Sequence, residues 1–372
     1  MKILLVGAGG YAANYVKSLL KNTDPDVHWV GVVDPYFDAS KVKDSIVEAG
    51  IPIYNDMEEF YKENTADLVL IATPPFLHGQ QSHTALAHGA CVLCEKPLCP
   101  TIEEAEEMLG FEKEYGKFLA IGYQWSYSDA IQALKRDILG GVLGRPVSMK
   151  TMISWPRTHT YYARGGGWGG RIERNGITVL DSIASNACAH YLHNMLFLLG
   201  DRMETAASPE TIDAWLRRAN DIETFDTCAI RLGMKDGTPL LFVASHAAKE
   251  RLDPVFVYTF ENAEVRYNEG EEGSEIVAYF RDGSTKSYGC PKKKNFKKIW
   301  DCVEAVKTGT RPICTVETAM EHTRVIGRLH RECEIESFPP DTVIEDVEGD
   351  RVYVEGLYET LCEIYESGEL PK

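Results

Sequence analysis

The first third of the chain alternates short apolar runs with stretches of helical periodicity. The apolar runs predict strands at 2–6, 28–34, 68–72, 91–94 and 118–122. The intervening stretches predict helices at 12–20, 40–49, 79–87 and 102–115. Strands that alternate with helices are typical of a parallel sheet with crossover helices. We therefore expect a doubly wound α/β domain over residues 1–123.

The pattern changes after residue 123. One more helix, 129–138, precedes extended segments with partly alternating polarity, as in a half-buried antiparallel sheet. Further strands are expected at 147–155, 228–232, 240–244, 255–260 and 276–280, with turns at Asp236-Gly237 and Asp282-Gly283. Further helices are expected at 181–199, 295–307 and 317–330. Residues 124–372 should form an α+β domain with a large, open, mostly antiparallel sheet, a substrate-binding and oligomerisation domain.

Composition narrows the class of protein. The chain has 39 Lys and Arg against 56 Asp and Glu, a formal charge of −17, which disfavours nucleic-acid binding. No run approaches the roughly 18 apolar residues needed to cross a bilayer, and the apolar start ends at Gly7, too early for a signal peptide. We expect a cytoplasmic protein that binds no membrane. The ten Cys are too sparse for a disulfide scaffold, and those inside apolar segments, Cys91, Cys94, Cys188 and Cys228 among them, are expected to be buried thiols.

A glycine-rich motif follows the first predicted strand. Residues 7–12, Gly-Ala-Gly-Gly-Tyr-Ala, fit the pattern G-x-G-x-x-A and open the first predicted helix, so helix N-terminal amides would face a pyrophosphate. Asp34 ends the second strand, 22 residues after Ala12, where its carboxylate can accept hydrogen bonds from ribose hydroxyls and would repel a 2′-phosphate. NAD is therefore expected, and NADP is disfavoured. The alternative is a glycine-rich turn without a nucleotide.

Two further motifs stand at the ends of the third and fourth strands. Residues 72–75 read Ala-Thr-Pro-Pro, with His78 soon after, and residues 95–97 read Glu-Lys-Pro. Open α/β sheets bind ligands at the carboxyl ends of their strands. A Glu-Lys-Pro triplet alone is usually an exposed turn, but the combination with the glycine-rich motif is specific.

With these motifs the chain resembles the Gfo/Idh/MocA family, the glucose–fructose oxidoreductase, inositol dehydrogenase and rhizopine-catabolism group. The resemblance continues through Gly144-Arg145-Pro146 and Leu198-Leu199-Gly200. It implies a Rossmann domain, an open-sheet domain, and nicotinamide-dependent oxidation or reduction of a sugar or cyclitol. The implied cofactor contacts are Gly7, Gly9, Gly10, Tyr11, Ala12, Asp34, Thr73, Pro74, Pro75, His78, Glu95 and Lys96.

The resemblance also implies catalytic residues. The family lysine beside the reacting hydroxyl corresponds to Lys96. The family pairs an Asp with a His four residues later, and counting back from Gly200 places Asn186 and His190 there. The next family Asp is replaced by His193. Neither replacement carries the negative charge that the family has near the base, which is expected to be His190. Asn186, which is uncharged, would orient the imidazole or the substrate.

A polar stripe is expected on the apolar helix 181–199. Ser182, Asn186, His190 and His193 fall at i, i+4, i+8 and i+11, one face of a regular helix. The alternative to a catalytic role is an internal hydrogen-bonded network that satisfies a buried helix. No metal site is expected, because no third ligand has suitable spacing.

Residues 155–175 are rich in Arg, aromatic residues and Gly, which suits the faces and hydroxyls of a sugar ring. A surface loop or subunit contact is the alternative. The candidate substrate-binding residues are Lys96, Tyr123, Gln124, Trp155, Arg157, Tyr162, Arg164, Trp168, Asn186, His190 and His193. The basic run 292–298 is expected to be a solvated face that could meet an acidic partner subunit.

The sequence therefore predicts an NAD-dependent oxidoreductase for a secondary alcohol of a sugar, sugar acid, cyclitol or glycoside. Two alternatives stay open. One is a glycosidase or lyase that oxidises its sugar transiently, and the other is a non-catalytic NAD-binding sensor. A homodimer or homotetramer is expected, because exposed apolar sheet faces usually find a partner.

Overall fold

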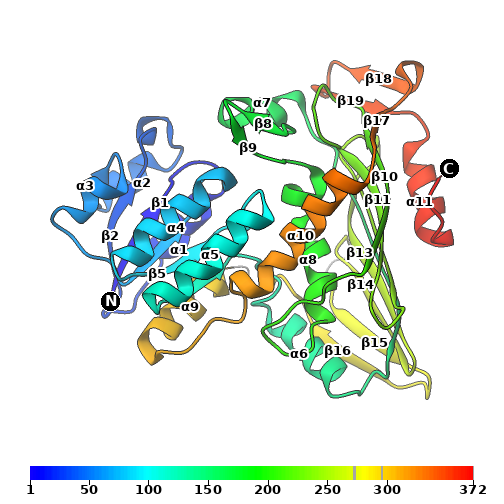
Figure 1. The fold of residues 1–372 in the computed structure, drawn as a ribbon, viewed down its shortest axis with the longest axis horizontal. Coiled ribbons are helices and arrows are strands. Elements are labelled where there is room, and N and C mark those ends of the chain that lie inside the picture. The colour runs from blue at the N-terminus through cyan, green and yellow to red at the C-terminus, as the bar shows by residue number, and fades with distance from the viewer. Residues whose placement is uncertain (271–273, 295, 372) are drawn as a thin grey trace. The chain divides into compact units, whose positions relative to one another are not determined.

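The computed structural model describes residues 1–270, 274–294 and 296–371. Contacts group the chain into two compact units (Figure 1). The first contains Met1–Tyr127 and Lys294–Met320, and the second contains Ser128–Lys293 and Glu321–Lys372. None of the helices in the described part of the chain is both long and apolar enough to span a membrane.

The first unit is built on a six-stranded parallel sheet in the order β3-β2-β1-β4-β5-β6. Its strands are β1 (Lys2–Val6), β2 (His28–Val33), β3 (Ile53–Tyr54), β4 (Leu68–Ile71), β5 (Cys91–Cys94) and β6 (Leu119–Ile121). Its helices are α1 (Ala12–Leu20), α2 (Lys43–Glu48), α3 (Met57–Tyr61), α4 (His78–Ala87), α5 (Ile102–Tyr115) and α9 (Lys297–Thr308). Short 3-10 turns lie at Phe37–Ala39 and Pro75–Leu77. The central strands are buried along their whole length because helices cover both faces of the sheet.

Helix α9 packs with this sheet although it lies about 175 residues after β6 in the sequence, and it contacts β4 and β5. Its first predicted position, 295, lies outside the described residues.

The second unit contains a nine-stranded sheet in the order β16-β15-β14-β13-β7-β12-β11-β10-β17. Its strands are β7 (Pro146–Ser154), β10 (Thr211–Arg218), β11 (Thr227–Gly233), β12 (Pro239–Ser245), β13 (Leu252–Phe260), β14 (Ala263–Asn268), β15 (Ile276–Phe280), β16 (Thr285–Gly289) and β17 (Ile335–Ser337). Neighbouring strands are antiparallel except β7 with β12 and β10 with β17. The two sheets confirm the predicted fold class.

Helices and two small hairpins complete the second unit. The helical segments are α6 (Asp129–Leu139), α7 (His159–Gly167), a π-helical turn (Ile183–Ala187), α8 (Ala189–Leu198), α10 (Val316–Glu332), a 3-10 turn (Pro340–Thr342) and α11 (Leu357–Ser367). Helix α10 belongs to this unit from Glu321 onward. The hairpins are β8 (Glu173–Arg174) with β9 (Ile177–Thr178), and β18 (Val343–Asp346) with β19 (Arg351–Val354). Helix α11 packs on β7 and β12, and α8 also contacts β7 (Figure 1).

Both predicted Asp-Gly turns are confirmed. Gly237 joins β11 to β12 with φ +85°, and Gly283 joins β15 to β16 with φ +86°. In each turn the Asp carboxylate accepts the backbone N–H two residues later, Thr238 at 3.0 Å and Ser284 at 2.9 Å. The aspartate thus stabilises the turn locally, which explains why the motif is visible in the sequence.

Candidate functional site

Gly7 shapes the turn between β1 and the glycine-rich loop. Its φ is +91°, and a Cβ at this position would lie 2.7 Å from the backbone oxygen of Ala72. Its N–H donates to Val33 O at 2.8 Å, which ties the loop to the end of β2. Only glycine meets both demands, the left-handed backbone and the close approach of a neighbouring chain.

Gly9 and Gly10 border open space instead. A Cβ at either position would meet no heavy atom within 4 Å. Ala12 is buried, and its N–H reaches back to Gly9 O at 3.0 Å, so α1 begins immediately after the loop. The first amides of a helix have no carbonyl partner within the helix and favour anions. These residues therefore fit the pyrophosphate of a dinucleotide.

Asp34 connects this loop to the end of β2. Its two carboxylate oxygens accept the N–H groups of Ala8 and Tyr36, each at 2.8 Å. A carboxylate has about four acceptor positions, so hydroxyl groups of a ribose can still be accepted. Tyr11 directly precedes α1 and is 43% exposed, and its hydroxyl donates to Gln124 Oε1 at 3.0 Å. Two residues predicted for different ligands, cofactor and substrate, are thus in contact.

His78 holds the two proline-containing loops together. The imidazole is completely buried, with Nδ1 2.9 Å from Pro97 O and Nε2 3.0 Å from Thr73 O. Burial lowers the pKa of this histidine. Any contribution of His78 to cofactor binding is therefore indirect, through the positions of these loops. Thr73 also donates its hydroxyl to Gln81 Oε1, and Pro75 begins the following 3-10 turn.

Glu95 is the first residue after β5 and directly precedes Lys96. Its buried carboxylate accepts the Tyr15 hydroxyl at 2.5 Å and forms an ion pair with Lys298 of α9. The Lys96 N–H also donates to Glu95, at 3.1 Å, and the Lys96 side chain is half-buried. Glu95 therefore helps to fix the backbone at Lys96, and because it is buried, a contribution of Glu95 to cofactor binding would be indirect.

The prediction that the basic run 292–298 is a solvated face is wrong for Lys298. This lysine is completely buried, and its ammonium group pairs with Glu95 and donates to Gly122 O at 3.2 Å. Lys297 instead pairs with Asp301 one turn along α9. Tyr123, predicted to face substrate, is completely buried as well, whereas Gln124 is half-buried.

The expected continuous helix 181–199 is also wrong. Ser182 has an extended backbone and caps a π-helical turn, residues 183–187, and α8 begins only at Ala189 after a break at Cys188. Because the wider turn does not follow a spacing of three and four residues, Ser182, Asn186, His190 and His193 do not form one helical stripe.

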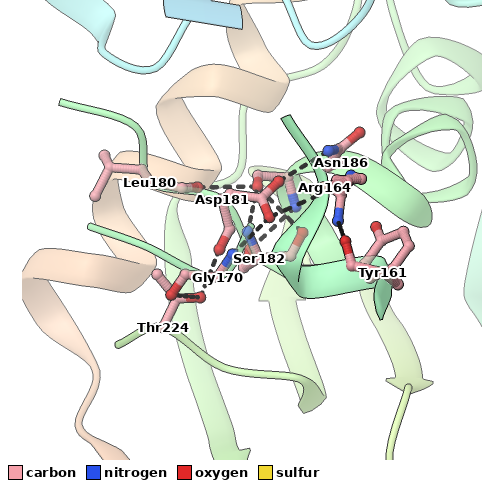
Figure 2. A network of polar contacts seen from close by, with 9 residues as sticks. Tyr161, Arg164, Gly170, Leu180, Asp181, Ser182, Asn186 and Thr224 are labelled. Carbon is pink, nitrogen blue, oxygen red and sulfur yellow. Dashed lines mark hydrogen bonds and ion pairs between the residues drawn. The ribbon is translucent and has the colours of Figure 1, made fainter. Parts of the chain in front are cut away.

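Asp181 is a buried carboxylate that the sequence analysis missed. Its Oδ1 accepts from Asn186 Nδ2 at 2.8 Å, and its Oδ2 accepts from the N–H of Gly170 at 2.8 Å (Figure 2). Arg164 Nη2 lies 3.7 Å from Oδ2. Asn186 thus has a carboxylate partner, while the expectation that positions 186 and 193 supply no negative charge near His190 stays a prediction. Residues five apart do not face each other on a regular helix, so helical spacing conceals this contact.

His190 and His193 both lie on α8, a helix whose residues are all buried. His193 has no exposed surface, its ring stacks on Phe197 at 6.0 Å, and burial lowers its pKa well below the usual value. These contacts agree with the alternative interpretation, in which His193 is part of the buried core around the helix. His190 is 9% exposed and is the second residue of the helix.

The segment after β7 gathers aromatic rings and guanidinium groups. Trp155 donates its indole N–H to Asp253 at 2.8 Å, and Arg157 lies over the rings of Trp155 and Tyr161. Arg164 lies over Tyr161, 3.6 Å from the ring centroid, and over Trp168. The rings and charges predicted from the sequence are thus packed mainly on one another.

A pocket of about 220 Å³ lies beside this segment, lined by His159, Tyr162, Ala163, Gly167, Gly169, Arg171 and 220–222. Among the candidate substrate residues only Tyr162 lines it. Lys96 and the glycine-rich loop belong to the first unit, and Asn186, His190 and the aromatic segment to the second. The predicted roles of all these residues stay predictions.

The parallel sheet, the glycine-rich loop and Asp34 together define a dinucleotide-binding Rossmann domain. Residues 1–123 match the family model of the Gfo/Idh/MocA oxidoreductases, described as an oxidoreductase family with an NAD-binding Rossmann fold. These residues therefore form an NAD-binding domain of this family, which confirms the resemblance inferred from the motifs.

The chain is also similar to curated relatives in sequence and to solved structures in fold. The chain is 30% identical over 166 residues to the rhizopine catabolism protein MocA of Rhizobium meliloti, covering 44% of this chain and 50% of that protein. It is 28% identical over 145 residues to inositol 2-dehydrogenase of Renibacterium salmoninarum, covering 39% and 43%. The chain thus spans about half the length of the curated relatives it matches. An oxidoreductase of Agrobacterium radiobacter, solved with NAD+, L-tartaric acid and magnesium, shares the fold with a TM-score of 0.73, 16% identity, and coverage of 89% and 95%.

Proposed function

We propose that this protein is an NAD-dependent oxidoreductase that acts on a secondary alcohol of a carbohydrate or cyclitol, including sugar acids and glycosides. One observation carries the proposal. The glycine-rich loop, Asp34 and Lys96 follow β1, β2 and β5, at the carboxyl edge of a single parallel sheet. Ligands bind at this edge in open α/β sheets. The names of the matched relatives agree with a polyhydroxylated substrate.

Different residues of the chain would bind the cofactor, stabilise the reacting oxygen and transfer the proton in such a reaction. When bound, NAD accepts a hydride from the substrate carbon. The amides at the start of α1 would hold its pyrophosphate, and Asp34 would accept from its ribose. Lys96 would donate a hydrogen bond to the reacting oxygen and stabilise the negative charge that develops there. His190 would take the hydroxyl proton, because an imidazole titrates near neutral pH.

Lys96→Ala tests the reaction. A panel of sugars, sugar acids, inositols and glycosides is first screened for NADH fluorescence. With the best substrate, we expect Lys96→Ala to lower kcat by about 100-fold and to leave the Kd for NAD within about twofold. Lys113→Ala, an exposed lysine of α5, is the matched control and should behave as wild type. Loss of NAD binding in Lys96→Ala would instead assign this lysine to cofactor binding or to the structure of the loop, and not to the reacting oxygen.

The screen also separates the alternatives. A lyase or glycosidase that oxidises its sugar transiently would convert substrate without net release of NADH, as product chromatography would show. A sensor would bind NAD and sugar without any turnover. A homodimer or homotetramer stays a prediction, to be tested by light scattering.

The preference for NAD over NADP has its own test. A 2′-phosphate would meet the Asp34 carboxylate, which already stands at the end of β2 beside the glycine-rich loop. We expect Asp34→Ala to weaken NAD binding by about tenfold and to reduce the discrimination against NADP, both measured by calorimetry. Asp38→Ala, a 93% exposed carboxylate nearby in the sequence, is the control. Equal affinity of wild type for both cofactors would refute the preference.

A further inference from the structure

The pocket beside the aromatic segment, residues 155–175, lies between two walls that are tied together. One wall is α7 with the residues that follow it, and the other is the connection between β10 and β11. The N–H groups of Glu223 and Thr224 donate to Gly170 O at 2.8 and 3.1 Å and join the two walls (Figure 2). Gly170 has φ +72°, and a Cβ at this position would lie 2.4 Å from Ile222, so only glycine lets the walls approach so closely.

Asn220 contributes a buried acceptor to the second wall. The residue is 6% exposed, and its Nδ2 and its N–H both donate to Asp226 Oδ2, at 2.8 and 2.9 Å. An ionised carboxylate accepts hydrogen bonds and cannot donate them, so Nδ2 must be the amide atom that faces Asp226. The other amide atom, Oδ1, is buried without a hydrogen-bond partner among the described residues. A buried acceptor of this kind is costly unless a donor from outside the chain satisfies it.

Tyr162 contributes a second buried polar atom, from α7. Its hydroxyl has no hydrogen-bond partner in the part of the chain that the structure describes. Burial, and to a lesser extent the charge of Asp226, raises the pKa of Tyr162, so the hydroxyl stays neutral and can both donate and accept. Because Asp226 acts on Tyr162 and on Asn220, the two side chains lie in one region of the pocket that both of them line.

The size and the apolar surface of the pocket suit a single small ring. Its volume of about 220 Å³ corresponds to roughly seven water molecules and lies below the about 300–1,000 Å³ of pockets for drug-sized ligands. The ring of Tyr162, Ala163 and the buried Ile222 offer apolar surface to the C–H face of a sugar or cyclitol ring. A Cβ at Gly167 would meet no heavy atom of the described chain within 4 Å, so the backbone borders open space there.

The charges at the pocket disfavour an anionic ligand. Arg171 Nη1 lies 3.0 Å from Glu223 Oε1, and His159 Nε2 lies 2.9 Å from Glu345 Oε1. Both basic side chains that line the pocket thus have a carboxylate partner, and Asp221 adds an exposed carboxylate. Phosphate and carboxylate ligands are bound best by cations that are free to pair with them. A hydroxyl group, in contrast, supplies a donor without adding charge.

We propose that this pocket binds one neutral, hydroxylated ring of the size of a monosaccharide or cyclitol. One hydroxyl of the ring donates to Asn220 Oδ1, and another forms a hydrogen bond with the Tyr162 hydroxyl. The ring is either a part of the substrate or a separate sugar, and the chemistry of recognition is the same for both. The site goes beyond the proposed function, because its residues all belong to the second unit and require neither NAD nor Lys96.

Binding to the NAD-free protein is the first test. The probes are D-glucose, D-galactose, D-mannose and myo-inositol, each titrated to about 50 mM and followed by ligand-detected NMR, with D-glucuronate as the charged comparison. We expect at least one neutral probe to bind with a Kd of about 1 mM, and D-glucuronate to bind more weakly than the best neutral probe. Failure of all four neutral probes to bind would show that the pocket holds water only and would overturn the proposal.

Tyr162→Phe tests the site with little disturbance, because the hydroxyl that it removes has no partner among the described residues. We expect the best probe to bind about tenfold more weakly and the melting temperature to stay the same. Tyr61→Phe is the matched control, because Tyr61 of α3 also has a buried hydroxyl without a described partner. It should leave the Kd of the probe unchanged. Equal affinity of wild type and Tyr162→Phe would contradict the proposal.

Monodeoxy analogues of the best probe separate a direct contact from a structural effect. Asn220→Ala also removes a donor from Asp226, so we expect a loss of stability as well as weaker binding. With the analogue that lacks the hydroxyl bonded to Asn220, wild type and Asn220→Ala should have the same Kd. A purely structural defect would instead persist with every analogue and would count against the contact. If Asn220→Ala does not fold, the same comparison with Tyr162→Phe carries the test.

Ala163→Leu fills the pocket from α7 and distinguishes the two sources of the ring. It should abolish binding of the probe, whereas Ala87→Leu, at an exposed alanine of α4, should not. With the best substrate of the NADH assay, a KM raised about tenfold at unchanged kcat would make the ring a part of the substrate. An unchanged KM would make it a separate sugar.

The remaining outcomes are also decisive. Binding that survives in Ala163→Leu would place the probe elsewhere and refute the site. Wild type that binds the probe in this pocket but oxidises no alcohol with NAD would overturn the proposed function and leave the site in place.

Discussion

Gly7 and Gly9 stand two residues apart in one loop, and the structure gives them different tasks. Gly7 has a left-handed backbone and touches the chain at Ala72, whereas Gly9 borders open space. The motif shows both as the same letter, because a sequence does not record whether a missing side chain makes room for the protein or for a ligand. The distinction predicts different effects for the same substitution, a loss of stability at Gly7 and a loss of NAD binding at Gly9.

We expect Gly7→Ala to lower thermal stability by about 1–3 kcal/mol, because the new Cβ would lie 2.7 Å from Ala72 O on a left-handed backbone. Gly9→Ala should leave the melting temperature nearly unchanged and weaken NAD binding by about tenfold or more, because its methyl group would occupy the space beside the loop. Differential scanning fluorimetry and calorimetry measure the two effects. Tight NAD binding by Gly9→Ala would show that the cofactor does not use this space.

At the scale of elements, α9 is secured to the Rossmann sheet by a buried ion pair. Lys298 pairs with Glu95 after β5, and neither side chain is more than 7% exposed. The neighbouring Lys297 pairs with Asp301 on the half-exposed side of the same helix. Two adjacent lysines in one basic run therefore differ in burial, which their shared charge does not indicate.

Lys298→Met should destabilise the protein by about 3–5 kcal/mol, because it leaves the Glu95 carboxylate buried without its cation. Lys297→Met should cost at most about 0.5 kcal/mol, as expected for an i,i+4 pair near the surface. Chemical denaturation followed by tryptophan fluorescence measures both changes. Similar losses in the two variants would contradict the assignment of α9 to the buried pair.

At the scale of the whole molecule, burial makes stability depend on pH in opposite directions at two positions. Burial lowers the pKa of His330 to about 4, and its Nε2 has no hydrogen-bond partner among the described residues. The unfolded chain, with a histidine pKa near 6.5, then binds more protons than the folded one between pH 6.5 and 4. This contribution to stability is present above pH 6.5 and is lost as pH falls toward 4. We expect His330→Leu to remove up to about 3 kcal/mol of this acid sensitivity, measured by urea denaturation at pH 7 and pH 4.5.

Glu104 provides the comparison of opposite sign. Burial raises its pKa to about 7, so the folded protein holds a proton that the unfolded chain releases above pH 4.5. The stability from this group is present below pH 4.5 and is lost as pH rises through 7. Glu104→Gln should therefore gain stability relative to wild type between pH 5 and 8. Parallel pH profiles for wild type and both variants would refute the two assignments.

The sequence by itself determined the elements whose signals are local. Helices α1 and α5 and strands β5 and β15 have the predicted bounds, because periodicity, glycine turns and caps act within a few residues. The glycine-rich loop and Asp34 were predictable for the same reason, since one strand-turn-helix unit contains the loop. The positions of Thr73, His78 and Lys96 at the sheet edge follow from the parallel order of the strands.

Only the tertiary structure decided contacts between distant or irregular segments. The pairing of Lys298 with Glu95 spans 203 residues, and no local pattern indicates it. The π-helical turn, which brings Asp181 against Asn186, replaces a helix that propensity alone would continue through 181–199. The tertiary structure also buries His78 between the two proline-containing loops, which it connects, and buries Tyr123 completely. In each case burial leaves a polar group that needs a partner, and that partner lies either far along the chain or outside regular helical spacing, which periodicity in the sequence does not report.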